Sequence, residues 1–242
     1  MAVAKSSCSP FAFTRIDDYQ EFATPMTSQL RVYVPPHPLV KHWLAIARDA
    51  STPDAIFRTA MTELGRWLTY EAIRDWLPTR DTTVNTPLAP CPATVVDAEV
   101  PLAIIPVLRA GLALLEGAQS LLPLASVYHL GFVRNEETLE ASCYLNKLPD
   151  QMPPQTRVLI PEPMLATGGT MMAVMAELTQ RGIDPAYVRI ISIVAAPPAL
   201  QKLSAVYSTL NIYTATIDEH VNDRGFIVPG LGDAGDRTFG TR

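Results

Sequence analysis

The residues best suited to bind a ligand or do chemistry lie between positions 157 and 170. Here an apolar run passes through a small-residue turn into a run rich in Met and Ala. We expect a strand, a turn and the start of a helix here. Gly168 and Gly169 allow a ligand to approach the backbone closely, and the free N–H groups at a helix start attract an anion. Thr167 and Thr170 add hydroxyl donors. The segment predicts a phosphate-binding loop, although by itself it fits an ordinary tight turn equally well.

Familiar nucleotide and metal motifs do not match the chain. No Lys follows the glycines as it does in a Walker A loop, and the spacing is not the GxGxxG of a dinucleotide site. The four histidines lack metal-ligand spacing, so we predict no metal site built from the protein's own side chains. The three cysteines are odd in number and have no paired spacing, which favours a reducing compartment.

Composition narrows the class of protein and its partners. Hydrophobic residues make up 48% of the chain and charged residues 18%, which is ample for a buried core. The net charge of −5 argues against nucleic acid as a partner. The longest apolar stretch, residues 100–115, contains Pro101, Pro106 and Arg109 and does not read as a membrane span. The amino-terminal segment has no apolar signal core, so we expect a cytoplasmic protein with no membrane partner.

The elements that must position the loop follow an alternating pattern that predicts an α/β fold. Apolar strands are expected over residues 102–107, 126–133, 157–161, 188–195 and 210–217, with helices over 112–122, 170–181 and 198–207. Such alternation favours right-handed βαβ units and a mainly parallel sheet flanked by helices. Two helices with a restart at residues 51–54 are expected over 39–76, and a loop or weak hairpin over 77–98.

Two long segments carry a family resemblance. The strand, acid and Ala-Thr-Gly-Gly-Thr of residues 157–170 resemble the PRPP-binding signature of type I phosphoribosyltransferases, and residues 226–241 resemble the carboxyl-terminal uracil-binding segment of uracil phosphoribosyltransferases. Residues 37–42, 106–111 and 134–139 agree in order and approximate spacing. The similarity spans residues 36–242, which we interpret as one phosphoribosyltransferase domain after an extension or arm over residues 1–35. It implies the type I fold with a small hood and an amino-terminal helical region.

The resemblance also implies the roles of individual residues. Arg109 and Asp233 would be catalytic, and backbone groups near Asp233 would read the edge of uracil. The PRPP site would consist of Arg109, Arg134, Glu162, Pro163, Met164, Leu165, Ala166, Thr167, Gly168, Gly169, Thr170 and Asp233. The uracil site would consist of Ile227, Gly232, Asp233 and Ala234.

The reaction implied is transfer of the 5-phosphoribosyl group from PRPP to uracil, which gives UMP and pyrophosphate. Mg²⁺ would arrive with PRPP and offset charge on the departing pyrophosphate, while the protein orients donor and base. Residues 134–139 would form a cover that excludes water. The resemblance further suggests GTP as an activator and a homodimer or higher homo-oligomer.

Departures from the family pattern leave two alternatives open. Glu162 stands where the family usually has Asp, Pro161 where it has an aliphatic residue, and Phe226 where it tends to have Tyr. The longer acid could displace the ribose, and a shift of about an ångström can cost on the order of a hundredfold in rate. A non-catalytic relative that binds PRPP or a nucleotide is therefore the main alternative, and an enzyme for another base is the second.

Overall fold

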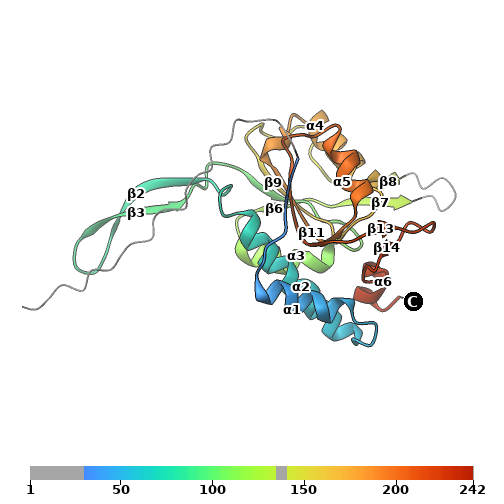
Figure 1. Cartoon of the computed structure of the whole chain (residues 1–242). Helices are drawn as coiled ribbons and strands as arrows, with labels where there is room; N and C mark the ends of the chain where they lie inside the picture. Colours follow the sequence, from blue (N-terminus) through green and yellow to red (C-terminus); the bar gives the residue numbers. More distant parts are fainter. Residues whose placement is uncertain (1–29, 135–140, 242) are drawn as a thin grey trace, which may run out of the picture.

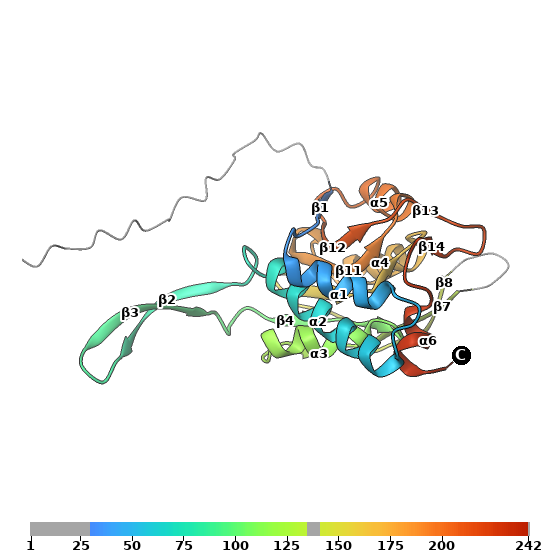
Figure 2. The same cartoon turned by 60° about the horizontal axis from the view of Figure 1, so that its bottom comes forward.

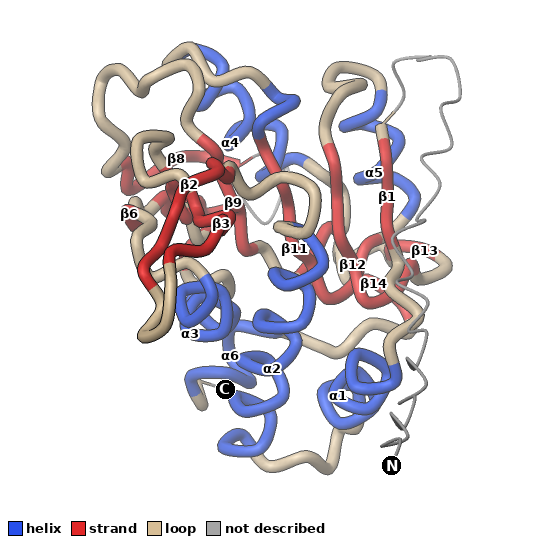
Figure 3. Tube along the Cα trace, turned by 90° about the vertical axis from the view of Figure 1, so that its left-hand side faces the viewer, coloured by secondary structure: helices blue, strands red, loops and turns tan. Residues whose placement is uncertain are grey.

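The computed structural model describes residues 30–134 and 141–241, and its centre is a seven-stranded parallel sheet. The strand order is β1-β12-β11-β9-β4-β6, with β10 paired to β11 beyond the end of β9. Figure 3 shows β11, β12 and β1 as neighbours. The strands are β1 (Arg31–Tyr33), β4 (Leu102–Ile104), β6 (Ser126–Val127), β9 (Arg157–Pro161), β10 (Met164–Leu165), β11 (Val188–Ala195) and β12 (Asn211–Ile217).

Helices cover both faces of this sheet (Figure 1). One face packs against α1 (Pro38–Arg48), α2 (Asp54–Ala72) and α3 (Leu112–Leu121), and the other against α4 (Gly169–Gln180) and α5 (Pro197–Ser204). Adjacent residues on one strand serve opposite cores, because strand side chains alternate. On β11, Ile191 joins the α2 side and Ile190 the α4 side, both fully buried. The predicted mainly parallel fold with flanking helices is confirmed.

Three smaller sheets surround the central one. A three-stranded sheet of β5 (Val107–Leu108), β7 (Leu130–Arg134) and β8 (Ala141–Asn146) lies near the carboxyl ends of the main strands. A hairpin of β2 (Thr79–Asn85) and β3 (Pro90–Val96) projects away from the body in Figures 1 and 2. A short pair, β13 (His220–Val221) and β14 (Ile227–Val228), precedes the short helix α6 (Ala234–Phe239). A 3₁₀ turn, Pro185–Tyr187, leads into β11.

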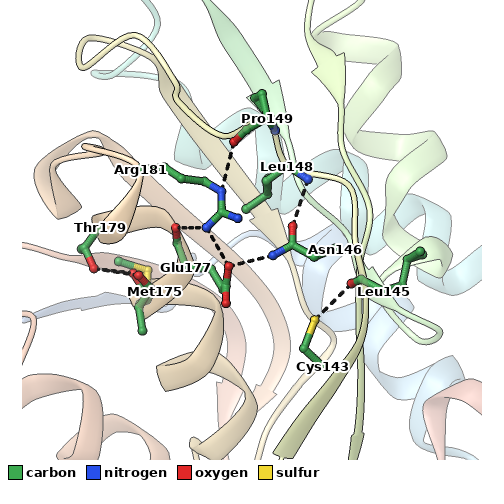
Figure 4. Close-up of polar contacts among 10 residues, drawn as sticks. Cys143, Leu145, Asn146, Leu148, Pro149, Met175, Glu177, Thr179 and Arg181 are labelled. Carbon is green, nitrogen blue, oxygen red and sulfur yellow. Dashed lines mark hydrogen bonds and ion pairs between the residues drawn. The ribbon is translucent and has the colours of Figure 1, made fainter.

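Side chains fix the three-stranded sheet to α4 (Figure 4). Asn146 Nδ2 donates to Glu177 Oε2 at 2.7 Å, and the same carboxylate pairs with Arg181 at 2.7 Å. Arg181 Nε also donates to the Pro149 carbonyl at 3.1 Å. The end of β8 is therefore tied to the helix that starts at the glycine loop.

The sequence prediction differed from the structure at three places. The strands expected over 102–107 and 126–133 are each interrupted, because the chain leaves the main sheet after β4 and β6 and joins the three-stranded sheet as β5 and β7. The hairpin over 77–98 is real, and its strands have seven residues each rather than being weak. Residues 31–33, inside the predicted extension, form edge strand β1, which is too short to show a hydrophobic period.

No helix in the described ranges is long and apolar enough to cross a membrane.

Candidate active site

A pocket of about 240 Å³ opens at the carboxyl ends of the central strands, where ligands bind in open α/β sheets. Two segments distant in sequence form most of its wall. The lining residues are Ala110, Phe132, Glu162, Met164, Leu165, Ala166, Thr167, Gly168, Gly169, Thr170, Met171, Gly225, Phe226, Gly232, Asp233, Ala234 and Gly235. The structure thus brings the glycine loop against the carboxyl-terminal segment that the sequence predicted to bind uracil.

The glycine loop has the geometry of an anion site. Gly168 has φ +79° and precedes α4 without supplying a side-chain cap, and its carbonyl accepts the Met172 N–H at 2.9 Å. The first N–H groups of a helix have no partner inside that helix and attract negative charge. A Cβ on Gly168 would lie 3.0 Å from Ala199 Cα, so glycine suits this position on both conformational and steric grounds.

The acid that begins the loop is strongly perturbed. Glu162 is half-buried in the pocket wall; its N–H donates to the Ile191 carbonyl at 3.0 Å, and its Oε1 accepts the Met164 N–H at 3.4 Å. Burial raises the pKa of the Glu162 carboxyl to about 8, and the hydrogen bond from Met164 opposes that rise only weakly. Near neutral pH the ligand-free carboxyl is mostly protonated and can donate a hydrogen bond as well as accept one.

The carboxyl-terminal segment presents mostly backbone to the pocket. Gly232, Asp233 and Ala234 line it, whereas Ile227 is 3% exposed in the core and lies one residue outside the lining formed by Gly225 and Phe226. The Asp233 carboxylate caps α6 by accepting the Asp236 N–H at 2.9 Å. Three of the four residues predicted to bind uracil therefore border the pocket directly.

The two predicted arginines differ in what the structure describes. Arg109 does not line the pocket but directly precedes Ala110, which does; its side chain is 55% exposed, and Nη2 lies 3.0 Å from Asp236 Oδ1. Its Nη1 is 3.4 Å from the Thr241 hydroxyl. Arg134 ends β7, but its side chain lies outside the described structure, as do residues 135–140 of the predicted cover.

Three charged residues that sequence reasoning did not assign hold the carboxyl-terminal segment in place. Arg48 pairs with Asp218, and both bond to the backbone of Gly230. Arg237 Nη2 donates to the Asp49 carbonyl at 2.7 Å, and its guanidinium lies 4.1 Å above the Phe57 ring. Arg237 Nη1 donates to the carbonyls of Ala47 and Leu231 at 2.5 and 2.7 Å. Asp218 follows a Thr-rich strand in the sequence, which hinted at a place near the site but not at a partner.

A glycine loop at the carboxyl edge of a parallel sheet, faced by a glycine-rich carboxyl-terminal segment, defines a phosphoribosyltransferase of type I. Comparison with known proteins identifies the family. The model of the family described as "Uracil phosphoribosyltransferase" matches residues 34–241. This chain belongs to the uracil phosphoribosyltransferase family, as the resemblance predicted.

Individual relatives agree with this assignment. A protein of Nostoc sp. named uracil phosphoribosyltransferase is 75% identical over 89% of this chain and all of its own length. A tobacco protein of the same name is 54% identical over 88% of this chain and 96% of its own. Among solved structures, the AQ2163 protein from Aquifex aeolicus superposes with a TM-score of 0.78 at 37% identity, covering 87% of this chain and 98% of the other.

Proposed function

We propose that this protein transfers the 5-phosphoribosyl group of PRPP to uracil and releases UMP and pyrophosphate. The observation that carries the proposal is that the glycine loop and Gly232, Asp233 and Ala234 line the same pocket. One wall suits a phosphorylated sugar and the other suits a small planar base, so donor and acceptor meet within one cavity.

The donor would be held by main-chain and side-chain groups in sequence along the loop. The N-terminus of α4 and the hydroxyls of Thr167 and Thr170 would bind the ribose 5-phosphate. Glu162 would contact the ribose hydroxyls, in the position where the family usually carries the shorter Asp. Arg109, which directly precedes Ala110 of the pocket lining, would bind the pyrophosphate group through its charged fork. Arg134 and residues 163–166 would also contact PRPP, as the family resemblance implies.

The base would be read by backbone groups of Ile227 and residues 232–234. Main-chain N–H and C=O groups suit the alternating donors and acceptors on the edge of uracil. In the reaction, a ring nitrogen of uracil forms a bond to the anomeric carbon while the bond from that carbon to pyrophosphate breaks. The electron pair of the broken bond leaves with pyrophosphate, and the attacking nitrogen gives up its proton to solvent water. Asp233 would act through its negative charge, which favours the positive character that develops on the ribose; its place in the pocket lining supports this role.

The residues present fit a magnesium ion that arrives with its substrate. Across the described ranges no group of three or more His, Cys, Asp or Glu side chains is placed to hold a metal. Mg²⁺ commonly keeps its waters and binds substrate phosphates with only one or two carboxylates. When bound, the ion would offset charge on the pyrophosphate; among the pocket-lining residues, Glu162 and Asp233 carry the carboxyl groups that could approach it.

Three further features of the proposal rest on the family resemblance. GTP would activate the enzyme, the chain would assemble as a homodimer or larger homo-oligomer, and it would work in the cytoplasm. Light scattering of the purified protein, with UMP formation measured with and without GTP, tests the first two directly.

The decisive experiment follows UMP formation from PRPP, Mg²⁺ and labelled uracil, with cytosine and purine bases as competing acceptors. UMP from the wild type supports the proposal, and preference for another base would reassign the acceptor. A Glu162→Asp variant runs alongside. A silent wild type with an active variant would mean that Glu162 disables an intact site. If both are silent while PRPP binds, the protein is the non-catalytic regulatory relative.

A further inference from the structure

The backbone of Gly230 is held by a partly buried ion pair rather than by a neighbouring strand. Arg48 Nη1 donates to the Gly230 carbonyl at 2.8 Å, and the Gly230 N–H donates to Asp218 Oδ2, also at 2.8 Å. Arg48 and Asp218 bond to each other through Nη1 at 2.9 Å and Nη2 at 2.5 Å. The Asp218 side chain is only 4% exposed. The carbonyl and the N–H of Gly230 are therefore both bonded to one ion pair, whose members come from the end of α1 and from the residue after β12.

The position that the pair holds accepts only glycine. Gly230 has φ +60°, and a Cβ there would lie 2.2 Å from the Ile227 carbonyl oxygen. Two residues later the chain reaches Gly232 and Asp233 in the pocket wall. A displacement at Gly230 is therefore carried directly to the groups that face the base.

Packing holds this stretch only in part: Leu231 and Ala234 lie in the core, each 3% exposed, on either side of Gly232 and Asp233. Gly232 and Asp233 border the main pocket and also a second hollow lined by Arg48, Pro229 and Arg237. Gly232 and Asp233 thus border two hollows, so directional bonds to the neighbouring Gly230 contribute to their position beside the packing of Leu231 and Ala234.

We propose that Arg48 and Asp218 are positioning residues for the base: a clamp that fixes the Gly230 peptide so that residues 232–234 meet uracil in the correct register. The inference rests on the proposed function, because it assigns the clamp to the uracil side of that pocket. Neither residue lines the main pocket, and their bonds run to Gly230 on the base side, so the clamp would govern base binding separately from phosphate binding.

Two ligands separate the two walls experimentally. Ribose 5-phosphate probes the donor loop alone, and UMP probes the donor loop together with the base segment. Calorimetry on the full chain gives the Kd of each, and steady-state kinetics gives KM for uracil and for PRPP. In Asp218→Asn, an amide replaces one acceptor of equal size, and we expect UMP Kd and uracil KM to rise about tenfold. The ribose 5-phosphate Kd should stay within about twofold of the wild type, since its contacts are unchanged.

Arg48→Lys provides a milder test that keeps the charge. Lys cannot bond both Asp218 and the Gly230 carbonyl in the planar fork that Arg provides, so uracil KM should rise about threefold. Glu71→Gln is the matched control, because it makes the same carboxylate-to-amide change in an ion pair with Arg74 on the surface. It should leave both dissociation constants unchanged.

The outcomes distinguish the clamp from the proposed function. A wild type that does not bind UMP overturns both. If the wild type makes UMP and folded Asp218→Asn and Arg48→Lys bind it with wild-type affinity, the clamp alone is overturned. Equal losses for UMP and ribose 5-phosphate also overturn it, because a general structural role would weaken both. If Asp218→Asn fails to fold, folded Arg48→Lys decides the question: the clamp requires weaker UMP binding with ribose 5-phosphate binding unchanged.

Discussion

The two walls of the pocket are held in different ways. The donor loop is fixed by main-chain bonds to its neighbours: the Pro163 carbonyl accepts the N–H groups of Ile193 and Val194 at 3.0 Å each, and Ala196 N–H donates to the Leu165 carbonyl at 2.9 Å. The base segment, residues 225–235, is fixed chiefly by side chains: Arg48 and Asp218 from distant parts of the sequence, and Arg237 from α6, in which the segment ends. The donor loop should therefore be sensitive to backbone changes, and the base segment to single side-chain changes.

The largest effect should come from a backbone change in the donor loop, Gly168→Ala. The new Cβ would meet Ala199 at 3.0 Å in a left-handed conformation, and the shifted loop should weaken PRPP binding and lower kcat/KM about a hundredfold. Gly182→Ala is the matched control, because Gly182 has φ +85° with nothing within 4 Å of its added Cβ. It should cost about 1 kcal/mol of stability and leave kinetics unchanged. Equal kinetic losses in both variants would contradict the comparison.

The base segment should respond most to loss of Arg237. Arg237→Met removes the donors to the carbonyls of Ala47, Asp49 and Leu231, and we expect the free energy of unfolding to fall by about 3 kcal/mol. Urea unfolding measures this change, and KM for uracil should rise more than KM for PRPP. Arg74→Met is the control, and its exposed pair with Glu71 predicts a loss below about 0.5 kcal/mol. Similar losses of stability in Arg237→Met and Arg74→Met would contradict the view that the base segment depends on single side chains.

The same difference explains how far the sequence alone could lead. The donor loop and residues 226–241 are contiguous patterns, so local residue types and a family resemblance located both walls. The clamp was not predictable, because Arg48 and Asp218 are 170 positions apart and nothing local says that an arginine at a helix end will meet an acid after a strand. Strand β1 escaped prediction for another reason: three residues are too few for a period, and only pairing with β12 makes them a strand.

A pH experiment tests whether a side chain of the donor loop, Glu162, also contributes to the stability of the fold. Burial raises the folded-state pKa of Glu162 from 4.5 to about 8, so the folded protein binds this proton more tightly than the unfolded chain. The favourable contribution is complete below pH 4.5, is lost as pH rises toward 8, and the free energy of unfolding therefore falls across that window. In Glu162→Gln the free energy of unfolding should fall by roughly 2 kcal/mol less across this window than in the wild type. The figure allows for the partial exposure of the Glu162 side chain.

Denaturant unfolding at several pH values between 4 and 9 provides the measurement. Glu99→Gln is the control, because that glutamate is exposed and outside the pocket. A wild type whose stability stays level between pH 5 and 8, as in the variant, would show that Glu162 is already ionised in the folded state and would contradict the raised pKa.

The smallest effect should come from the ion pair of Arg109, which follows β5, with Asp236 on α6. Asp236 lies on α6 at the end of the base segment, and its pKa is held below the usual range by hydrogen bonds from Thr241 and then Arg109. In the ligand-free protein Asp236 occupies the guanidinium that pyrophosphate would bind, so Asp236→Asn should lower KM for PRPP about twofold because an exposed pair is weak.

The direction of that change is more informative than its size. Asp223→Asn removes the same charge from an exposed residue between β13 and β14 and should leave KM for PRPP unaltered, which controls for net charge. Because an exposed pair is screened by salt, the difference between the two variants should shrink at high ionic strength. A rise in KM for PRPP in Asp236→Asn would mean that Asp236 aims Arg109 at the donor rather than competing for it. The base segment would then help to build the donor site, and the two walls would not be independent.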